Sequence, residues 1–179
     1  MLTVPMIILS LPLLFVPPTS GDASNTLLPK VTVVGPPWIS IEYPVNPYDA
    51  STRSALLVVH AFHHGTPTAS PVRGTAEGIV NGARRSMALT LTTTSRPGVF
   101  ALSQQWPNEG TWTLLLSVVQ GRDDSVTAVV ELGTSGEVAS IQVPTRHTNG
   151  HRIPAAVAMA AVEASLRDRA AERSTSRPE

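Results

Sequence analysis

The chain lacks cysteine, contains one lysine, has few aromatic residues and carries no net charge. The absence of cysteine excludes disulfides, thiol catalysis, zinc–thiolate sites and a lipid anchor on cysteine. The absence of net charge excludes a broad electrostatic field that attracts nucleic acid or acidic lipid. A chain of 179 residues is nevertheless long enough to build a hydrophobic core without disulfide bonds.

The N-terminus contains an apolar run from Met6 to Val16, shorter than the roughly 20 residues that a membrane span needs. It fits a secretory signal peptide, and Gly21-Asp22-Ala23 offers small residues for cleavage after Ala23. No Lys or Arg precedes the run, so an uncleaved anchor remains the alternative. We predict a signal peptide at 1–23, a linker at 24–29 and no stable membrane span after cleavage. Twelve arginines against one lysine, together with abundant Ala and Pro, indicate a GC-rich bacterial genome. With the predicted signal peptide, the expected location is the periplasm or the cell exterior.

Short alternating apolar runs separated by turn residues fill the middle of the chain, and no helical pattern lies between them. This spacing predicts an antiparallel sandwich or barrel over residues 30–145. The dipeptide Asn81-Gly82 favours positive φ at both turn positions and closes a two-residue hairpin. The predicted strands are Val31–Val34, Trp38–Val45, Ser54–His64, Val72–Val80, Ala83–Thr92, Val99–Gln105, Thr111–Val119, Val126–Leu132 and Val138–Val143.

The stretch from Ser95 to Val119 joins two alternating apolar runs through a Pro/Asn/Gly turn and therefore predicts an antiparallel hairpin. Trp112 leads the most apolar strand and is expected in the core. Trp38 and Trp106 are expected as core or corner anchors. Of the three, Trp106 beside Pro107 is the one suspected of exposure, although a packed lid over the end of the sandwich is favoured.

The C-terminal part changes from strand to helix character. We predict a loop at 146–153, a helix at 154–173 with Pro154 in its first turn, and a disordered tail at 174–179. The apolar stripe of Met159, Val162 and Leu166 is thin, which favours docking on the edge of the sandwich or fraying.

All five histidines fall into two short segments, which makes them the candidate metal ligands. On a continuous strand His60 and His64 would lie about 13 Å apart, too far for one ion. A turn near His63, which Gly65 permits, would be needed to gather them. The candidate copper or zinc site is therefore a shared one, built from His60, His64, His147 and His151.

Motifs of the common enzyme classes are missing. The chain has no G-x-S-x-G, Walker loop, H-E-x-x-H or Rossmann glycine pattern. The acidic residues Glu109, Asp123 and Asp124 occupy turn positions, where solvation and backbone hydrogen bonding explain them. We predict that the protein is not an enzyme and uses no cofactor, with copper or zinc as the alternative.

The segments Gly98-Val99-Phe100 and Gly110-Thr111-Trp112-Thr113-Leu114 resemble the closing hairpin of small bacterial immunoglobulin-like domains. These domains include periplasmic YtkA-like and carboxypeptidase-regulatory-like modules. The resemblance implies an all-β, immunoglobulin-like antiparallel β-sandwich. Some YtkA-like proteins are linked to copper handling, so it also implies a test of the histidines.

The sequence thus predicts a non-catalytic exported binding or accessory module. Its partner is expected to be an unknown protein or envelope component and not nucleic acid. The alternative is a periplasmic copper or zinc carrier that uses the two histidine segments.

Overall fold

The computed structural model describes residues 36–121 and 124–175. The predicted signal peptide 1–23, the linker 24–29 and the strand Val31–Val34 lie outside these ranges, as does most of the predicted tail 174–179. Within them, no helix combines the length and the apolar character that a membrane span requires.

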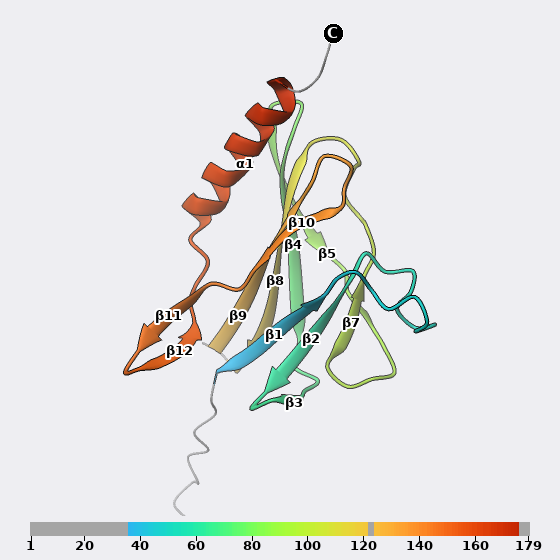
Figure 1. Cartoon of the computed structure of the whole chain (residues 1–179), viewed down its shortest axis with the longest axis vertical. Helices are drawn as coiled ribbons and strands as arrows, with labels where there is room; N and C mark the ends of the chain where they lie inside the picture. Colours follow the sequence, from blue (N-terminus) through green and yellow to red (C-terminus); the bar gives the residue numbers. More distant parts are fainter. Residues whose placement is uncertain (1–35, 122–123, 176–179) are drawn as a thin grey trace, which may run out of the picture. The chain divides into compact units, whose positions relative to one another are not determined.

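Two antiparallel sheets contain most of the strands (Figure 1). The first sheet contains β1 (Pro37–Glu42), β2 (Leu57–His63), β3 (Thr66–Pro67), β6 (Thr92–Thr93) and β7 (Val99–Leu102). The second sheet contains β4 (Val72–Val80), β5 (Ala83–Leu89), β8 (Thr111–Gln120), β9 (Asp124–Leu132) and β10 (Val138–Gln142). A separate hairpin, β11 (Thr145–Thr148) with β12 (His151–Pro154), precedes the helix α1 (Met159–Thr175). The order is β1-β2-β7-β6 in the first sheet, with β3 on β2, and β10-β9-β8-β4-β5 in the second.

Every strand predicted within the described ranges forms, with ends shifted by a few residues. The predicted Asn81-Gly82 turn is confirmed, because both residues have positive φ, 50° and 75°, and β4 pairs with β5 across them. Pro44 and Pro47 predict an edge strand, and β1 is at the edge of its sheet.

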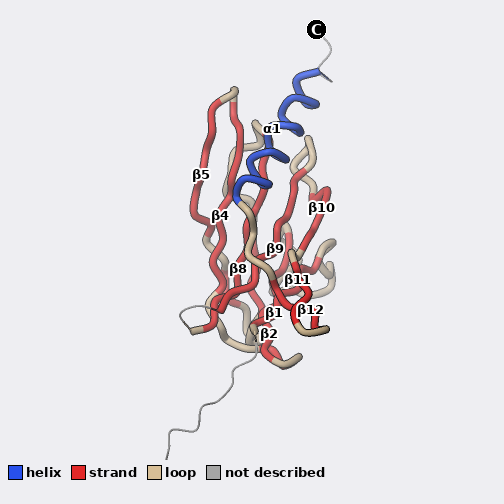
Figure 2. Tube along the Cα trace, turned by 90° about the vertical axis from the view of Figure 1, so that its left-hand side faces the viewer, coloured by secondary structure: helices blue, strands red, loops and turns tan. Residues whose placement is uncertain are grey.

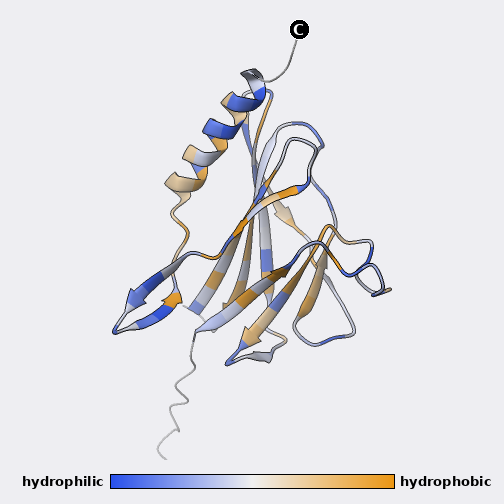
Figure 3. Ribbon diagram, in the orientation of Figure 1, coloured by the Kyte–Doolittle hydropathy of each residue, from blue (hydrophilic) through white to orange (hydrophobic). Residues whose placement is uncertain are grey.

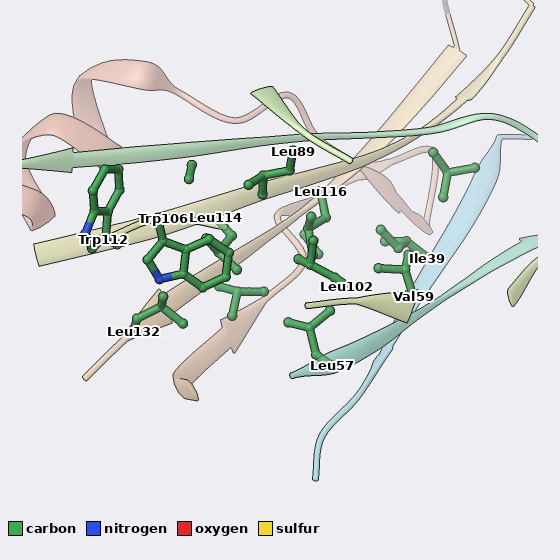
Figure 4. Packing of buried hydrophobic residues seen from close by; sticks show 14 of the residues in the cluster. Ile39, Leu57, Val59, Leu89, Leu102, Trp106, Trp112, Leu114, Leu116 and Leu132 are labelled. Atoms are coloured by element: carbon green, nitrogen blue, oxygen red, sulfur yellow. The ribbon is translucent and has the colours of Figure 1, made fainter. Parts of the chain in front are cut away.

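The core lies between the two sheets and is built from alternate residues of their strands (Figure 4). In β8 the predicted inward face is confirmed, since Trp112, Leu114, Leu116 and Val118 are all buried. Trp112 lies over Gly78 of the neighbouring strand, where a Cβ atom would come within 2.4 Å of the indole ring. A glycine is therefore required beneath this tryptophan.

The hairpin predicted from Ser95 to Val119 is wrong. β7 pairs with β2 and β6 in the first sheet, whereas β8 pairs with β4 and β9 in the second. The intervening segment crosses between the sheets, and Trp106 within it is 4% exposed. The suspected exposure of Trp106 is therefore also wrong, and the buried indole fits the favoured alternative of a packed lid. Alternation identified both strands but carries no information about the sheet to which each belongs.

The inward face predicted for β10 is partly wrong. Alternation in the sequence predicts that Ala139, Ile141 and Val143 share one face of this strand, but a register shift between Val138 and Ser140 interrupts the alternation. Val138 and Val143 pack on the core, while Ile141 is 38% exposed. The irregularity has the effect of a β-bulge, which turns the following side chains to the other face.

The C-terminal elements differ from the prediction. Residues 145–154 form the β11–β12 hairpin instead of a loop, and the helix begins at Met159 instead of Pro154. Asn149 and Gly150 have φ of 50° and 77°, so they make the same two-residue turn as Asn81-Gly82. Pro154 belongs to β12, paired with Thr145, and therefore cannot open the helix.

Helix α1 packs on the outer face of the second sheet and not on its edge (Figure 2). Val162 and Leu166 are its buried side chains, whereas Met159 of the predicted stripe is 44% exposed. The i,i+4 spacing of Glu163 and Arg167 predicts an ion pair on this helix, and the pair is present at 3.9 Å. The first sheet carries no such helix within the part of the chain that the structure describes.

Candidate functional site

The outer face of the first sheet is formed by alternate residues of β1, β2 and β7. Register places Trp38 opposite Phe62, Ser40 opposite His60 and His60 opposite Val99. Directly opposite residues point to the same side of a sheet, so these side chains share one surface. The residues that alternate with them, including Ile39, Val59 and Ala61, belong to the core.

An aromatic row runs along this face, and we define it as Trp38, Phe62 and His60. Trp38 is 41% exposed and lies opposite Phe62. The Phe62 and His60 rings stack with centroids 6.2 Å apart and an interplanar angle of 12°. Tyr43 and Tyr48, 39% and 94% exposed, follow at the end of β1 and in the next loop. Exposed aromatic side chains therefore concentrate between residues 38 and 48.

The other end of the face is covered. Val58 is fully buried although it points outward, opposite Ala101. The Asn46 N–H donates to Glu42 Oε1 at 3.0 Å, and Arg96 pairs with Asp49 at 2.7 Å, so the β1–β2 loop is held in place. The open part of the face is thus the end that carries the aromatic row.

A hydrogen-bonded couple, Glu42 and His60, lies at the end of the row. His60 Nε2 lies 2.9 Å from Glu42 Oε2, with the side chains 19% and 29% exposed. The hydrogen bond from His60, and after it the one from Asn46, lowers the pKa of the Glu42 carboxyl below its usual value. This couple fixes the orientation of the imidazole in the row and leaves a polar rim beside apolar rings.

The depressed pKa of Glu42 predicts an acid-dependent loss of stability. A carboxylate with a lowered folded-state pKa stabilises the fold above its ordinary pKa and ceases to do so as pH falls through the lowered one. Glu42→Gln should therefore cost about 0.5–1 kcal/mol at neutral pH, a range kept small because the pair is partly exposed. The difference from wild type should begin to shrink near pH 4.5, the ordinary value, and disappear in stronger acid.

Urea unfolding at neutral and acidic pH measures this effect. Glu109→Gln is the matched control, because Glu109 is exposed and its side chain has no bonded partner among the described residues. A difference between wild type and Glu42→Gln that stays constant from neutral to strongly acidic pH would contradict the prediction.

The histidines proposed as metal ligands are not brought together. His64 lies in the two-residue turn after β2, with φ of 49°, and its ring meets the edge of His63. His147 pairs with Arg152 and His151 with Thr148, so these two imidazoles point to opposite faces of their hairpin. Among the residues that the structure describes, no three His, Asp or Glu side chains converge as a metal site. The shared site of His60, His64, His147 and His151 therefore does not form in this arrangement.

A second concentration of charge lies beneath α1, on the outer face of the second sheet. Register aligns Ser86, Glu77, Thr113 and Glu131 across four strands. Arg84 binds Glu77 at 2.6 Å and the helix residue Glu163 at 2.7 Å. Burial alone lowers the pKa of Arg84, but the hydrogen bonds to Glu163 and Glu77 outweigh it and raise the pKa overall. These groups are all bonded, which indicates a structural clamp for the helix.

Arg169 is the centre of this clamp. Its guanidinium donates to the Trp112 carbonyl at 3.2 Å, to the Leu132 carbonyl at 3.1 Å and to Thr113 Oγ1. It also lies 3.8 Å from Glu131, while burial lowers its pKa. The two carbonyls belong to β8 and β9 just beyond the last residue pair of the β8–β9 ladder, so Arg169 links the two strands where their own pairing ends.

A cavity of about 320 Å³ lies beside the end of α1, with Leu132, Arg169 and Arg173 in its wall. Arg173 donates to the carbonyls of Gly110 and Thr134. The arginines at this cavity already have protein partners, so it offers less to a ligand than the aromatic row does.

The aromatic row was not identified from the sequence, although a signal for it was present. Alternation in β1 sends Ile39 and Ile41 inward and Ser40 and Glu42 outward. By the same alternation, Trp38 points outward.

Two exposed surfaces remain as functional candidates, the aromatic row and the β11–β12 hairpin. Comparisons with protein-family models, with curated proteins and with solved structures gave no match, so the geometry of these surfaces carries the functional argument.

Proposed function

We propose that this protein is a non-catalytic binding module of the bacterial periplasm or exterior, and that the aromatic row is its contact surface. The partner is a protein or envelope component. The observation that carries the proposal is the contrast between the two sheets: α1 covers the outer face of the second, while the first exposes Trp38 beside the half-buried Phe62.

We further propose an immunoglobulin-like β-sandwich. The order β1-β2-β7-β6 corresponds to A-B-E-D of that fold, and β5-β4-β8-β9 corresponds to C′-C-F-G. β10 extends the second sheet beyond this pattern. Such domains commonly serve as recognition modules, but the assignment of function rests on the surface and not on the topology. The export component is supported by the apolar run Met6–Val16.

A partly exposed tryptophan contributes to recognition because it offers large apolar area with little conformational entropy to lose. Phe62 and His60 continue the surface across β2, and the Glu42–His60 couple adds hydrogen-bonding groups at its border. Apolar rings bordered by polar groups are the anatomy expected of a protein interaction site. The row therefore supports binding better than it supports chemistry.

Trp38→Ala is expected to weaken recognition strongly while leaving the fold intact. Truncation of a central aromatic contact costs about 2 kcal/mol or more, which corresponds to at least a roughly 30-fold weaker complex. Affinity capture from native envelope extract, followed by titration of the captured component, measures the loss. Ile141→Ala is the control, because Ile141 is 38% exposed but lies on β10 of the second sheet.

Equal affinity for wild type and Trp38→Ala would contradict the assignment of the row. Failure of the native extract to yield any saturable ligand would contradict the binding function itself.

A further inference from the structure

The β11–β12 hairpin concentrates positive charge in a chain that is neutral overall. It contains Arg146, His147, His151 and Arg152, all exposed, and no acidic residue occurs between Glu137 and Glu163. Neither arginine of the hairpin forms an ion pair with a carboxylate in the described ranges, and Arg152 bonds only Thr145 Oγ1, at 2.8 Å. Arg84, Arg96 and Arg169, by contrast, all pair with acidic side chains.

The hairpin forms a two-stranded sheet of its own and projects from the two large sheets (Figure 1). Register places Arg146 opposite Ile153 and His147 opposite Arg152, so each face of the hairpin carries one arginine. Pro154 is buried and Ile153 is half-buried at its base, which leaves the turn at Asn149-Gly150 as the outer end. Because both faces of the hairpin carry an arginine, the hairpin is better suited to an environment with anions on both sides than to packing one face flat against a protein partner.

An apolar stretch follows the hairpin directly (Figure 3). Residues 155–161 read Ala-Ala-Val-Ala-Met-Ala-Ala and contain no polar side chain. Most of them are exposed, including Met159 at 44%. Basic side chains beside exposed apolar ones are the combination found in segments that lie at a membrane surface.

We propose that the β11–β12 hairpin and residues 155–161 together dock on an anionic phospholipid surface. The arginines bind lipid phosphates, and the apolar stretch contacts the boundary between headgroups and acyl chains. Nucleic acid would match the charge but would gain nothing from the apolar stretch. The surface is separate from the aromatic row, so the proposal does not depend on the proposed function.

The lack of cysteine allows a direct test in the full chain. Thr148→Cys places a unique thiol on β11, next to the turn, for an environment-sensitive fluorophore. Vesicles of phosphatidylglycerol with phosphatidylcholine should shift its emission to shorter wavelength and allow quenching by lipid-borne quenchers. Ser54→Cys, exposed in the β1–β2 loop, is the matched control position. A fluorophore there should show neither the emission shift nor the quenching. Because the readout is local, an N-terminal segment that itself binds membranes does not obscure it.

Removing the charge should weaken docking. Each arginine near an anionic membrane contributes roughly fivefold to partitioning, so Arg146→Gln/Arg152→Gln should weaken the fluorescence response about 25-fold. Arg53→Gln/Arg73→Gln removes two other exposed arginines and should leave it unchanged. Met159→Ser should weaken the response at constant charge. Circular dichroism and thermal midpoints confirm that each variant is folded.

Three results would overturn the proposal. One is an equal response to vesicles of phosphatidylcholine alone. Another is a response unchanged by Arg146→Gln/Arg152→Gln in a folded variant. The third is a response to duplex DNA that is as strong as the response to anionic vesicles, with neither response weakened by Met159→Ser.

Discussion

Trp112→Ala is expected to lower the free energy of unfolding by about 3–5 kcal/mol, the usual cost of truncating a core tryptophan or phenylalanine. The indole is 4% exposed and packs over Gly78, and its Nε1–H donates to the Glu109 carbonyl at 2.8 Å. Truncation therefore opens a cavity and also leaves that carbonyl without its partner. Equilibrium unfolding in urea, followed by circular dichroism, measures the loss.

Trp38→Ala provides the comparison within the same chain. Because Trp38 is 41% exposed, its truncation should cost less than about 1 kcal/mol. Similar losses for the two variants would mean that the inward and outward faces of the sheets are misassigned.

Arg169→Ala is expected to cost about 2–4 kcal/mol, because it removes one partner from several buried interactions at once. The carbonyls of Trp112 and Leu132 lose their donor, and Glu131 loses its nearby positive charge. Lysine should not restore stability fully, since its single ammonium cannot reproduce the planar fork of donors. Chemical unfolding of the purified variants gives the comparison.

Arg167→Ala is the control on the same helix. Arg167 is 70% exposed and makes one long ion pair with Glu163, so its removal should change stability by less than about 1 kcal/mol. Equal effects at the two positions would show that the helix is held by its apolar side chains alone. Hydrogen exchange of α1 in Arg169→Ala should also reveal release of the helix before the sheets unfold.

Strands were predictable where buried and exposed residues alternate along them. Met87 and Leu89 illustrate this, since they alternate with exposed residues in β5 and pack on the core. Two-residue turns were in principle equally predictable from their Asn-Gly dipeptides. Asn149-Gly150 carries the same signal as Asn81-Gly82, but its short polar flanks led to the prediction of a loop.

Which strands pair with each other was harder to predict from the sequence. Alternation depends on neighbouring residues, whereas the sheet to which a strand belongs depends on contacts between distant parts of the chain. β7 and β8 have neighbouring sequences but different sheets, and only the crossing at Trp106 separates them. The role of Arg169 was inaccessible for a related reason. Two of its acceptors are backbone carbonyls, which every residue possesses, so no side-chain pattern marks them.

The helix over the second sheet also limits how copies of this chain can associate. A sandwich with two bare faces can stack face to face without end, because each new copy presents a fresh surface. Here α1 occupies one of the two faces, so stacking through bare sheet faces can only join the open face of one copy to the open face of another. Such a contact is isologous, uses the same residues on both copies and closes at a dimer.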